Sequence, residues 1–148
     1  MISVEAFEEI DAPPAAVWEI LLEFDSYPEW NPFVRSIVGH PVKGERLVVT
    51  IQPPGARAMT FTPAVIALET NKRFAWRGQI VVPFVFDGYH EFHLEPVDGA
   101  QRTRFLQRET FRGALVPVLL DERQIERGFR EMNRALKDRA EGRLSIAH

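Results

Sequence analysis

The chain has 148 residues, of which 45% are hydrophobic and 26% are charged, and its formal net charge is -3. This composition is typical of a globular protein, and the length suits a single domain over residues 1–148 with its own core. The slightly acidic balance provides no basic field for a nucleic-acid backbone, so nucleic acid is not an expected partner. The absence of cysteine excludes disulfides, thiol nucleophiles and thiolate metal ligands.

The sequence shows no pattern typical of a signal peptide or of a membrane span. Residues 1–5 show neither the basic region nor the apolar region of a signal peptide, and no apolar run approaches 18 residues. We therefore expect a cytoplasmic protein without a membrane span. Phenylalanine is abundant, with 11 residues against 2 tyrosines and 3 tryptophans, which suits an apolar core and an apolar cavity equally well.

The first predicted elements are one strand and two short helices. Residues 2–10 alternate loosely between apolar and polar, which predicts a strand. Asp11 and the prolines that follow it are typical of a helix start, and apolar residues then recur at helical spacing to about Glu23. Residues 25–32 predict a second short helical turn, opened by a capping residue and closed by a proline.

From Phe33 onward the apolar residues recur with a period of two, which indicates β-strands. The predicted strands cover residues 33–39, 45–52, 58–68, 72–79, 87–96 and 102–111. Their short connections favour an antiparallel meander. Residues 80–86 form an apolar link in which Pro83 argues against a central strand, and we interpret this link, with its Phe84 and Phe86, as a gate.

A long amphipathic helix is predicted from Gly113 to Ala140, roughly 35 Å in length at about 1.5 Å per residue. The residues that form its narrow apolar stripe are Val118, Ile125, Phe129, Met132, Leu136 and Ala140. Residues 141–148 lie beyond the stripe and are expected to fray. The predicted fold class is α+β: a seven-stranded curved antiparallel sheet, with two short helices after its first strand, wrapped around one long C-terminal helix.

The order of these elements and several short motifs resemble the START-related helix-grip superfamily (SRPBCC). The motifs are PPAAVW at 13–18, YPEWNPF at 27–33, HEFHLEP at 90–96, TRF at 103–105, ETFRG at 109–113 and MNRALK at 132–137. The superfamily includes the birch-pollen-allergen type, lipid-transfer domains and bacterial polyketide cyclase/dehydrase-like proteins, and the match covers essentially the whole chain. The resemblance implies a helix-grip fold with a cavity between the concave face of the sheet and the long helix. It does not imply one function.

Strand register predicts which side chains line this cavity. A hairpin turn at residues 97–100 sets His90 opposite Glu109, and Trp76 on the preceding strand is then expected beside His90. Met59 is expected on the same face. The predicted ligand-binding residues are Trp30, Phe33, Phe61, Trp76, Phe84, Phe86, His90, Phe92, Gln107, Glu109, Phe111, Leu115, Leu119 and Phe129.

Four polar residues interrupt this mostly apolar face: Arg35, His90, Gln107 and Glu109. A buried charge must be paired, so His90, Glu109 and Arg35 are the candidates for catalysis if the protein is an enzyme. His90 and Glu109 form either a cavity dyad that holds or passes a proton, or a structural pair that ties two strands together. Arg35 either binds a ligand carboxylate or neutralises Glu109.

Two features of the long helix each have two explanations. Asp121 and Glu122, near its start, either face the cavity mouth as acids or complement the positive end of the helix dipole. Gly128 flanks the apolar stripe in mid-helix, where it costs stability relative to alanine. It makes room either for a ligand or for a close contact with a strand.

The function that we favour is the binding of a hydrophobic small molecule, such as a lipid, quinone or polyketide-like aromatic compound, in the cavity. The first alternative is an enzyme resembling the polyketide cyclases and aromatases, in which cavity His, Glu and Arg promote ring closure or dehydration. The second is a co-chaperone-like or other protein-interaction module, which an apolar patch on the outer sheet face would favour.

No cofactor and no metal are expected. The chain has no Gly-rich phosphate loop and no nucleophile elbow, and nothing in it demands catalysis. The histidines, which are not at metal-ligand spacing, are His40, His90, His93 and His148. His93 is expected to point away from the face that carries His90.

Overall fold

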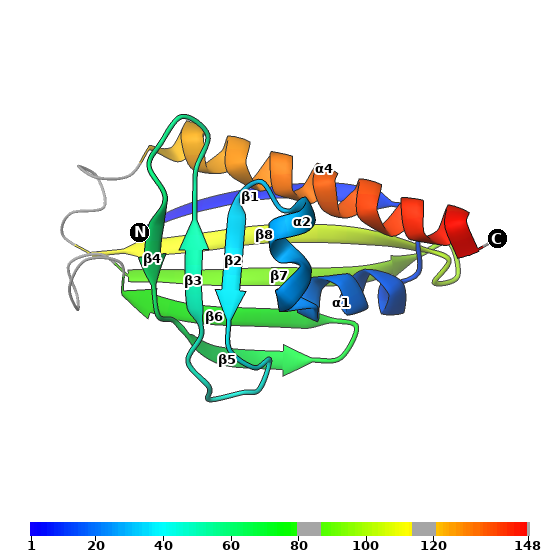
Figure 1. Ribbon diagram of the computed structural model, residues 1–148, viewed down its shortest axis with the longest axis horizontal. Helices are drawn as coiled ribbons and strands as arrows, with labels where there is room; N and C mark the ends of the chain where they lie inside the picture. Colours follow the sequence, from blue (N-terminus) through cyan, green and yellow to red (C-terminus); the bar gives the residue numbers. More distant parts are fainter. Residues whose placement is uncertain (80–86, 114–120, 148) are drawn as a thin grey trace.

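The computed structural model describes residues 1–79, 87–113 and 121–147, and it shows a long helix lying along an antiparallel sheet (Figure 1). The strands are β1 (Ile2–Ile10), β2 (Val34–Val38), β3 (Val48–Ile51), β4 (Met59–Phe61), β5 (Ala64–Glu69), β6 (Arg73–Gln79), β7 (Asp87–Val97) and β8 (Arg102–Arg112). The helices are α1 (Pro14–Leu22), the 3-10 turn η1 (Phe24–Ser26), α2 (Tyr27–Trp30) and α4 (Glu122–Ala147). This arrangement confirms the predicted α+β helix-grip class.

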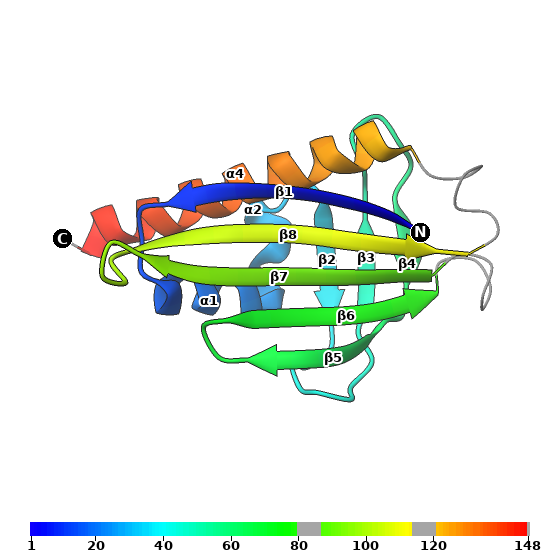
Figure 2. The ribbon, with the colours of Figure 1, turned by 180° about the vertical axis from the view of Figure 1, so that it is seen from behind.

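Five long strands form the main sheet, in the order β1-β8-β7-β6-β5, and every neighbouring pair is antiparallel (Figure 2). The β7–β8 hairpin turns through Asp98–Ala100, where all three residues have a positive φ. This tight turn fixes the register. It places His90 opposite Glu109, and the next strand places Trp76 opposite His90, both as predicted.

The strand count differs from the prediction, because the described strands number eight and lie in two sheets. The predicted strand 58–68 is divided into β4 and β5, since Pro63 between them has no amide hydrogen for a ladder bond. β2, β3 and β4 form a three-stranded sheet that crosses the long strands (Figure 1). A bridge between Arg46 and Ala64, and a 2.9 Å hydrogen bond from the amide of Leu47 to the Pro63 carbonyl, join the two sheets.

Both short helices have a proline in their first turn, and Asn31 is the C-cap of α2. The prediction that Asp11 caps α1 is wrong. The N-cap of α1 is Pro13, and no side chain caps this end. The fixed φ of proline suits this position. At the end of α2, the side-chain oxygen of Asn31 accepts hydrogen bonds from the amides of Phe33 at 3.0 Å and Val34 at 2.8 Å. These bonds direct the chain into β2.

The long helix starts later than predicted. Gly113 has a φ of 131°, which is incompatible with a right-handed helix, and β8 continues to the residue before it. The helix begins at Glu122, and Asp121 caps it by accepting a hydrogen bond from the amide of Gln124 at 3.2 Å. This bond supports the helix-terminus explanation of the two acidic residues.

The helix also ends later than predicted, so the expected fraying from residue 141 is wrong. α4 continues to Ala147. Two polar contacts bind this last part to the rest of the molecule. Glu141 accepts a 2.9 Å hydrogen bond from the amide of Asp11, and Arg143 lies 3.3 Å from the carboxylate of Glu23. The apolar stripe is therefore not what determines where the helix ends.

The core lies between the inner face of the main sheet, α4, the short helices and the three-stranded sheet. Phe129, Met132 and Leu136 on the stripe have no exposed surface, as the amphipathic pattern predicted. Burying each of these side chains contributes roughly 1.5–3 kcal/mol. Val118, the first residue of the predicted stripe, lies outside the described residues.

Candidate functional site

Three side chains from neighbouring strands meet in the interior: Trp76 on β6, His90 on β7 and Glu109 on β8. They are directly opposite one another in one cross-strand row, so they point to the same face of the sheet. Their exposed fractions are 1%, 2% and 6%. The sequence-based expectation that these three residues share the inner face is therefore confirmed.

His90 is hydrogen-bonded through both of its ring nitrogens. Its Nδ1 lies 3.0 Å from Oε1 of Glu109, and its Nε2 lies 2.8 Å from Oε1 of Gln107. Gln107 donates from Nε2 to Oδ1 of Asn133 at 2.8 Å, and Asn133 donates from Nδ2 to the backbone carbonyl of Ala6 at 3.0 Å. A continuous chain of buried hydrogen bonds thus connects β7 and β8 to α4 and β1.

Aromatic rings surround the imidazole of His90. Its ring centroid lies 4.9 Å from that of Trp76, 4.7 Å from Phe92 and 5.2 Å from Phe129. Phe33 continues this shell, because its ring packs edge-on against Phe129 at 5.5 Å. The polar chain therefore lies in an apolar environment, where each hydrogen bond is stronger and each unpaired polar group costs more than in water.

One donor in this row is unpaired. The indole Nε1 of Trp76 is buried and has no hydrogen-bond partner among the described residues. A buried donor left without an acceptor costs about 1–3 kcal/mol. At the turn after α2, Trp30 Nε1 and Asn31 Nδ2 are also buried without a partner in the described part of the chain. These three buried N–H groups are therefore unpaired in the described part of the chain, one in the interior row and two at the C-terminal end of α2.

Arg35 lies outside the interior, so its predicted place on the cavity face is wrong. The pairing of β2 with β3 shifts between Val34 and Ser36, and this bulge moves the intervening side chain to the surface. There Arg35 donates from one guanidinium nitrogen to the carbonyl of Asn31 at 3.3 Å. It is not placed to neutralise Glu109 or to bind a carboxylate in the interior.

The remaining predicted lining residues fall into three groups. Those that are buried in the interior are Phe33, Phe92, Gln107, Phe111 and Phe129. Those that are partly buried against the core are Trp30 and Phe61. Those outside the described residues, whose role stays a prediction, are Phe84, Phe86, Leu115 and Leu119. Met59 lies opposite the buried Ile51, on the same face of the short sheet as Phe61, as predicted, but it is 43% exposed near the edge.

Gly128 meets a steric requirement of the core. A Cβ atom at this position would lie 2.5 Å from Cδ1 of Phe33, a distance that no real Cβ contact adopts. Phe33 immediately precedes β2, and its ring needs this space to reach Phe129. The close-contact explanation of Gly128 is therefore the correct one of the two.

The sequence reasoning missed Asn133 as a member of this site. This residue is 1% exposed and lies one helical turn after Phe129, within the buried side of α4. The signal was present in the sequence, since Asn133 is a lone amide among the core-facing positions of an amphipathic helix. A buried amide has to find partners, and those partners are Gln107 and the Ala6 carbonyl.

The outer face of the main sheet carries a second glutamate–histidine pair. His93 points to this face, as predicted, and its Nε2 lies 3.0 Å from Oε1 of Glu91. Arg108 donates to the other carboxylate oxygen at 3.1 Å, and Arg73 lies 3.5 Å from Oε1. Burial alone would raise the pKa of Glu91, but the hydrogen bonds from Arg108 and His93 outweigh it and lower that pKa.

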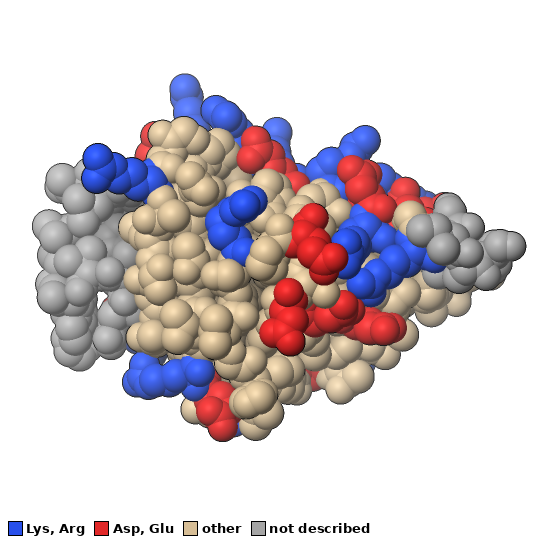
Figure 3. Space-filling view, in the orientation of Figure 1, with Lys and Arg blue, Asp and Glu red and all other residues tan. Residues whose placement is uncertain are grey.

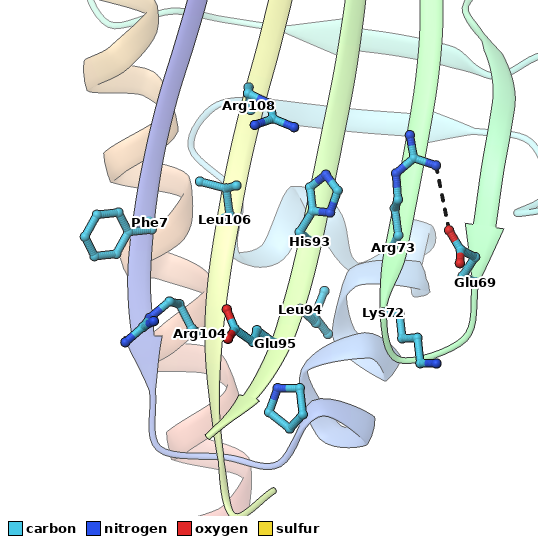
Figure 4. Close-up of a pocket in the computed structure, with 11 residues that line it drawn as sticks. Phe7, Glu69, Lys72, Arg73, His93, Leu94, Glu95, Arg104, Leu106 and Arg108 are labelled. Atoms are coloured by element: carbon cyan, nitrogen blue, oxygen red, sulfur yellow. Dashed lines mark ion pairs between the residues drawn. The ribbon is translucent and has the colours of Figure 1, made fainter. Parts of the chain in front are cut away.

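Two open hollows also lie on the outer face. One, of about 790 Å³, surrounds the exposed Phe7 and the neighbouring Leu106 with charged side chains (Figure 4). The other, of about 590 Å³, lies beside Tyr89. Several guanidinium groups here are in ion pairs, as Arg104 is with Glu9 at 2.9 Å and Arg108 is with Glu91 at 3.1 Å.

No group of three or more His, Asp or Glu side chains in residues 1–79, 87–113 and 121–147 is arranged to hold a metal ion. Within the same residues, no helix combines the length and the apolar character that crossing a membrane requires.

Solved structures support the helix-grip arrangement. The Zhui aromatase/cyclase from Streptomyces sp. R1128 is 21% identical with a TM-score of 0.75, over 97% of this chain and 95% of that chain. A START superfamily protein from Mycobacterium smegmatis is 17% identical with a TM-score of 0.71, over 95% and 97% of the two chains. Ara h 8.0201 is 16% identical with a TM-score of 0.69, over 95% and 98%. At these identities the likeness shows the fold alone.

A search of curated proteins gave no match. A family model described as "Polyketide cyclase / dehydrase and lipid transport" matches residues 1–141, from the start of the chain into the last turns of α4. This match includes every residue of the interior row and of the hydrogen-bond chain. Together with the fold neighbours it confirms the START-related superfamily that the sequence motifs indicated. The chain belongs to the polyketide cyclase / dehydrase and lipid transport family.

Proposed function

We propose that this protein binds a hydrophobic small molecule in the interior between its main sheet and α4, with the polar group of that molecule near Trp76. The observation that carries the proposal is the indole N–H of Trp76. It is buried on a mostly apolar face and has no acceptor among the described residues. Because buried donors are nearly always paired in folded proteins, an unpaired one points to an acceptor supplied by a bound molecule.

The chemistry of the surrounding residues supports this proposal. Ligand sites are mostly apolar with a few placed polar groups, and the row of Trp76, His90 and Glu109 within a shell of phenylalanines has that character. The family description joins polyketide chemistry with lipid transport, and both deal with largely hydrophobic molecules.

The test is mass spectrometry of an organic extract of the purified protein, comparing the wild type with Trp76→Phe. This substitution keeps an aromatic ring but removes the indole N–H together with part of the ring volume. The matched control is Trp18→Phe, because Trp18 is a buried tryptophan of α1 away from the interior row. We expect a hydrophobic compound in the wild type and in Trp18→Phe, and its loss from Trp76→Phe. Equal amounts in all three proteins would contradict the proposed contact.

The enzyme alternative retains one supporting observation, the carboxyl group of Glu109 beside His90 in the interior. Two other observations weaken it. Both ring nitrogens of His90 are engaged by side chains, and Arg35 is on the surface. Glu109 is then the one remaining acid or base of the three residues proposed for catalysis. Loss of cyclised product from a poly-β-ketone thioester in Glu109→Gln, with unchanged binding, would favour this alternative.

The interaction alternative also has one observation in its favour. Figure 3 shows that the face over β2, β3 and β4 has few charged side chains. Val38 and Val48 lie opposite each other there, and they are 64% and 41% exposed. A change of apparent mass on size-exclusion chromatography that Val38→Lys abolishes would favour a protein partner at this face.

A further inference from the structure

The chain of buried hydrogen bonds has a direction, and the backbone carbonyl of Ala6 sets it. A carbonyl oxygen can only accept, so the Asn133 group that contacts it is the amide NH₂. The oxygen of Asn133 then faces Gln107, which must donate with its own NH₂. The oxygen of Gln107 consequently faces Nε2 of His90, and this nitrogen must carry a proton to complete the chain.

With Nε2 protonated, the remaining question is where the proton between Nδ1 of His90 and Glu109 lies. Nδ1 of His90 lies 3.0 Å from Oε1 of Glu109, and a hydrogen bond at this distance needs one proton between the two atoms. That proton sits either on Nδ1, which gives an imidazolium and a carboxylate, or on Glu109, which gives a neutral imidazole and a carboxylic acid. In both forms the pair holds one shared proton and has no net charge.

We propose that Gln107 and Asn133 are positioning residues that keep the proton on Nε2 of His90, and that the resulting neutral pair makes the interior select an uncharged ligand. The first half concerns the protein alone, and the second rests on the proposed binding function. Such a ligand has a hydrogen-bond acceptor, for example a carbonyl oxygen, for the indole N–H of Trp76.

The distribution of charge supports the second half. No lysine or arginine is buried among the described residues, and the buried Glu91 belongs to the outer face. The segments 80–86 and 114–120, which lie outside the described residues, contain apolar residues alone and so contribute no charged side chain. A carboxylate in the interior would therefore have no fixed cation, and an unpaired buried charge is strongly unfavourable.

The first half is tested by nitrogen and proton NMR of the His90 ring in the ligand-free, full-length protein, with the signals assigned by comparison with His90→Gln. We expect Nε2 to be of the pyrrole type, with a slowly exchanging proton. A pyridine-type Nε2 would overturn the proposal. In Gln107→Leu, which removes the acceptor, we expect the Nε2 proton to be lost. Retention of that proton would show that Gln107 does not position it.

A control separates this effect from general loss of stability. Thr103 donates a buried hydrogen bond to the carbonyl of Ala12 at 2.8 Å and has no contact with His90. Thr103→Val removes one buried bond, as Gln107→Leu does, and we expect it to leave the His90 signals unchanged. If Thr103→Val moved them equally, the role assigned to Gln107 would be wrong.

The second half is tested with a matched pair of probes, 2-acetylnaphthalene and 2-naphthoate, which share a ring system and differ in charge. Binding is followed by the change in tryptophan fluorescence of the otherwise unchanged protein, and Trp76→Phe shows which part of the change comes from Trp76. We expect the carboxylate to bind at least about tenfold more weakly. Equal or tighter binding of 2-naphthoate would overturn the selectivity. Failure of both probes would count against the binding function, whereas the NMR result alone decides the proton assignment.

Discussion

Each face of the main sheet holds a glutamate–histidine pair, and the two pairs differ in their surroundings. On the inner face, His90 and Glu109 are 3.0 Å apart among aromatic rings and side-chain amides. On the outer face, His93 and Glu91 are also 3.0 Å apart, but Arg108 adds a hydrogen bond to the carboxylate. Cations fix the charge of the outer glutamate, whereas the inner pair has to balance its own charge.

The comparison shows that a glutamate beside a histidine does not by itself determine how the two groups interact with their surroundings. The same two side chains at the same separation become part of an ion cluster when arginines flank them. With amides and phenylalanines around them, they become a buried pair that depends on each partner being present. Matched substitutions on the two faces can therefore test whether this difference is real.

The largest effect is expected from replacing each histidine by phenylalanine. His90→Phe leaves the buried carboxyl of Glu109 and the oxygen of Gln107 without partners, so we expect a loss of about 3–5 kcal/mol in unfolding free energy. His93 is partly exposed, and Glu91 keeps its arginines, so His93→Phe should cost about 1 kcal/mol or less. Urea denaturation at neutral pH measures both values. Equal losses would remove the distinction between the faces.

The second effect compares a buried and an exposed glycine of α4. Gly128→Ala forces a Cβ to within 2.5 Å of the Phe33 ring, so we expect a loss of about 1–3 kcal/mol. Gly142→Ala is the matched control, because a Cβ there meets no atom within 4 Å. It should stabilise the helix by about 0.5–1 kcal/mol, since alanine is the better helix former.

Thermal unfolding of both variants distinguishes the possibilities. If Gly128→Ala were stabilising, the interior would have room at this position. The explanation that Gly128 makes room for a ligand would then be favoured over the close contact. The result also bears on the inner pair, because Phe33 supports Phe129, whose ring lies 5.2 Å from that of His90.

Sequence periodicity correctly predicted which side chains of the regular strands face inward. The inward-facing row of Trp76, His90 and Glu109 followed from counting outward from a hairpin turn, because side chains alternate strictly along a regular strand. The same counting placed Arg35 wrongly, because the bulge before Ser36 inserts one residue that alternation does not include. The pattern contains no separate signal for such a bulge.

Local chemistry decided the points that periodicity missed. The apolar stripe predicted which side of α4 is buried, but Asp121 as a cap and Gly113 with its positive φ decided where the helix begins. The partner of Gly128 could not be predicted either, because Phe33 and Gly128 are far apart in the sequence and meet only in the folded chain. Long-range contacts between side chains cannot be read from spacing.

The third prediction uses pH to isolate the outer pair. The pKa of Glu91 is lower in the folded protein than in an unfolded chain, where a glutamate titrates near about 4.3. Its carboxylate therefore stabilises the fold above that pH, and the contribution disappears as the pH falls through the folded-state pKa. We expect Glu91→Gln to be about 1 kcal/mol less stable than the wild type at neutral pH. The difference should vanish in acid, and a constant difference across this range would contradict the assignment.

The smallest effect is expected at Arg35, and this expectation separates the surface from the interior most directly. Arg35 is exposed and donates one hydrogen bond of 3.3 Å to the Asn31 carbonyl, so Arg35→Ala should change stability by less than about 0.5 kcal/mol. It should also leave the amount of co-purified hydrophobic compound unchanged, because Arg35 is exposed at the surface, whereas the inner pair is buried. Mass spectrometry of the extract measures this amount. A loss of the compound in Arg35→Ala, with stability unchanged, would mean that a cation reaches the ligand after all, and the interior would then suit an anion rather than an uncharged molecule.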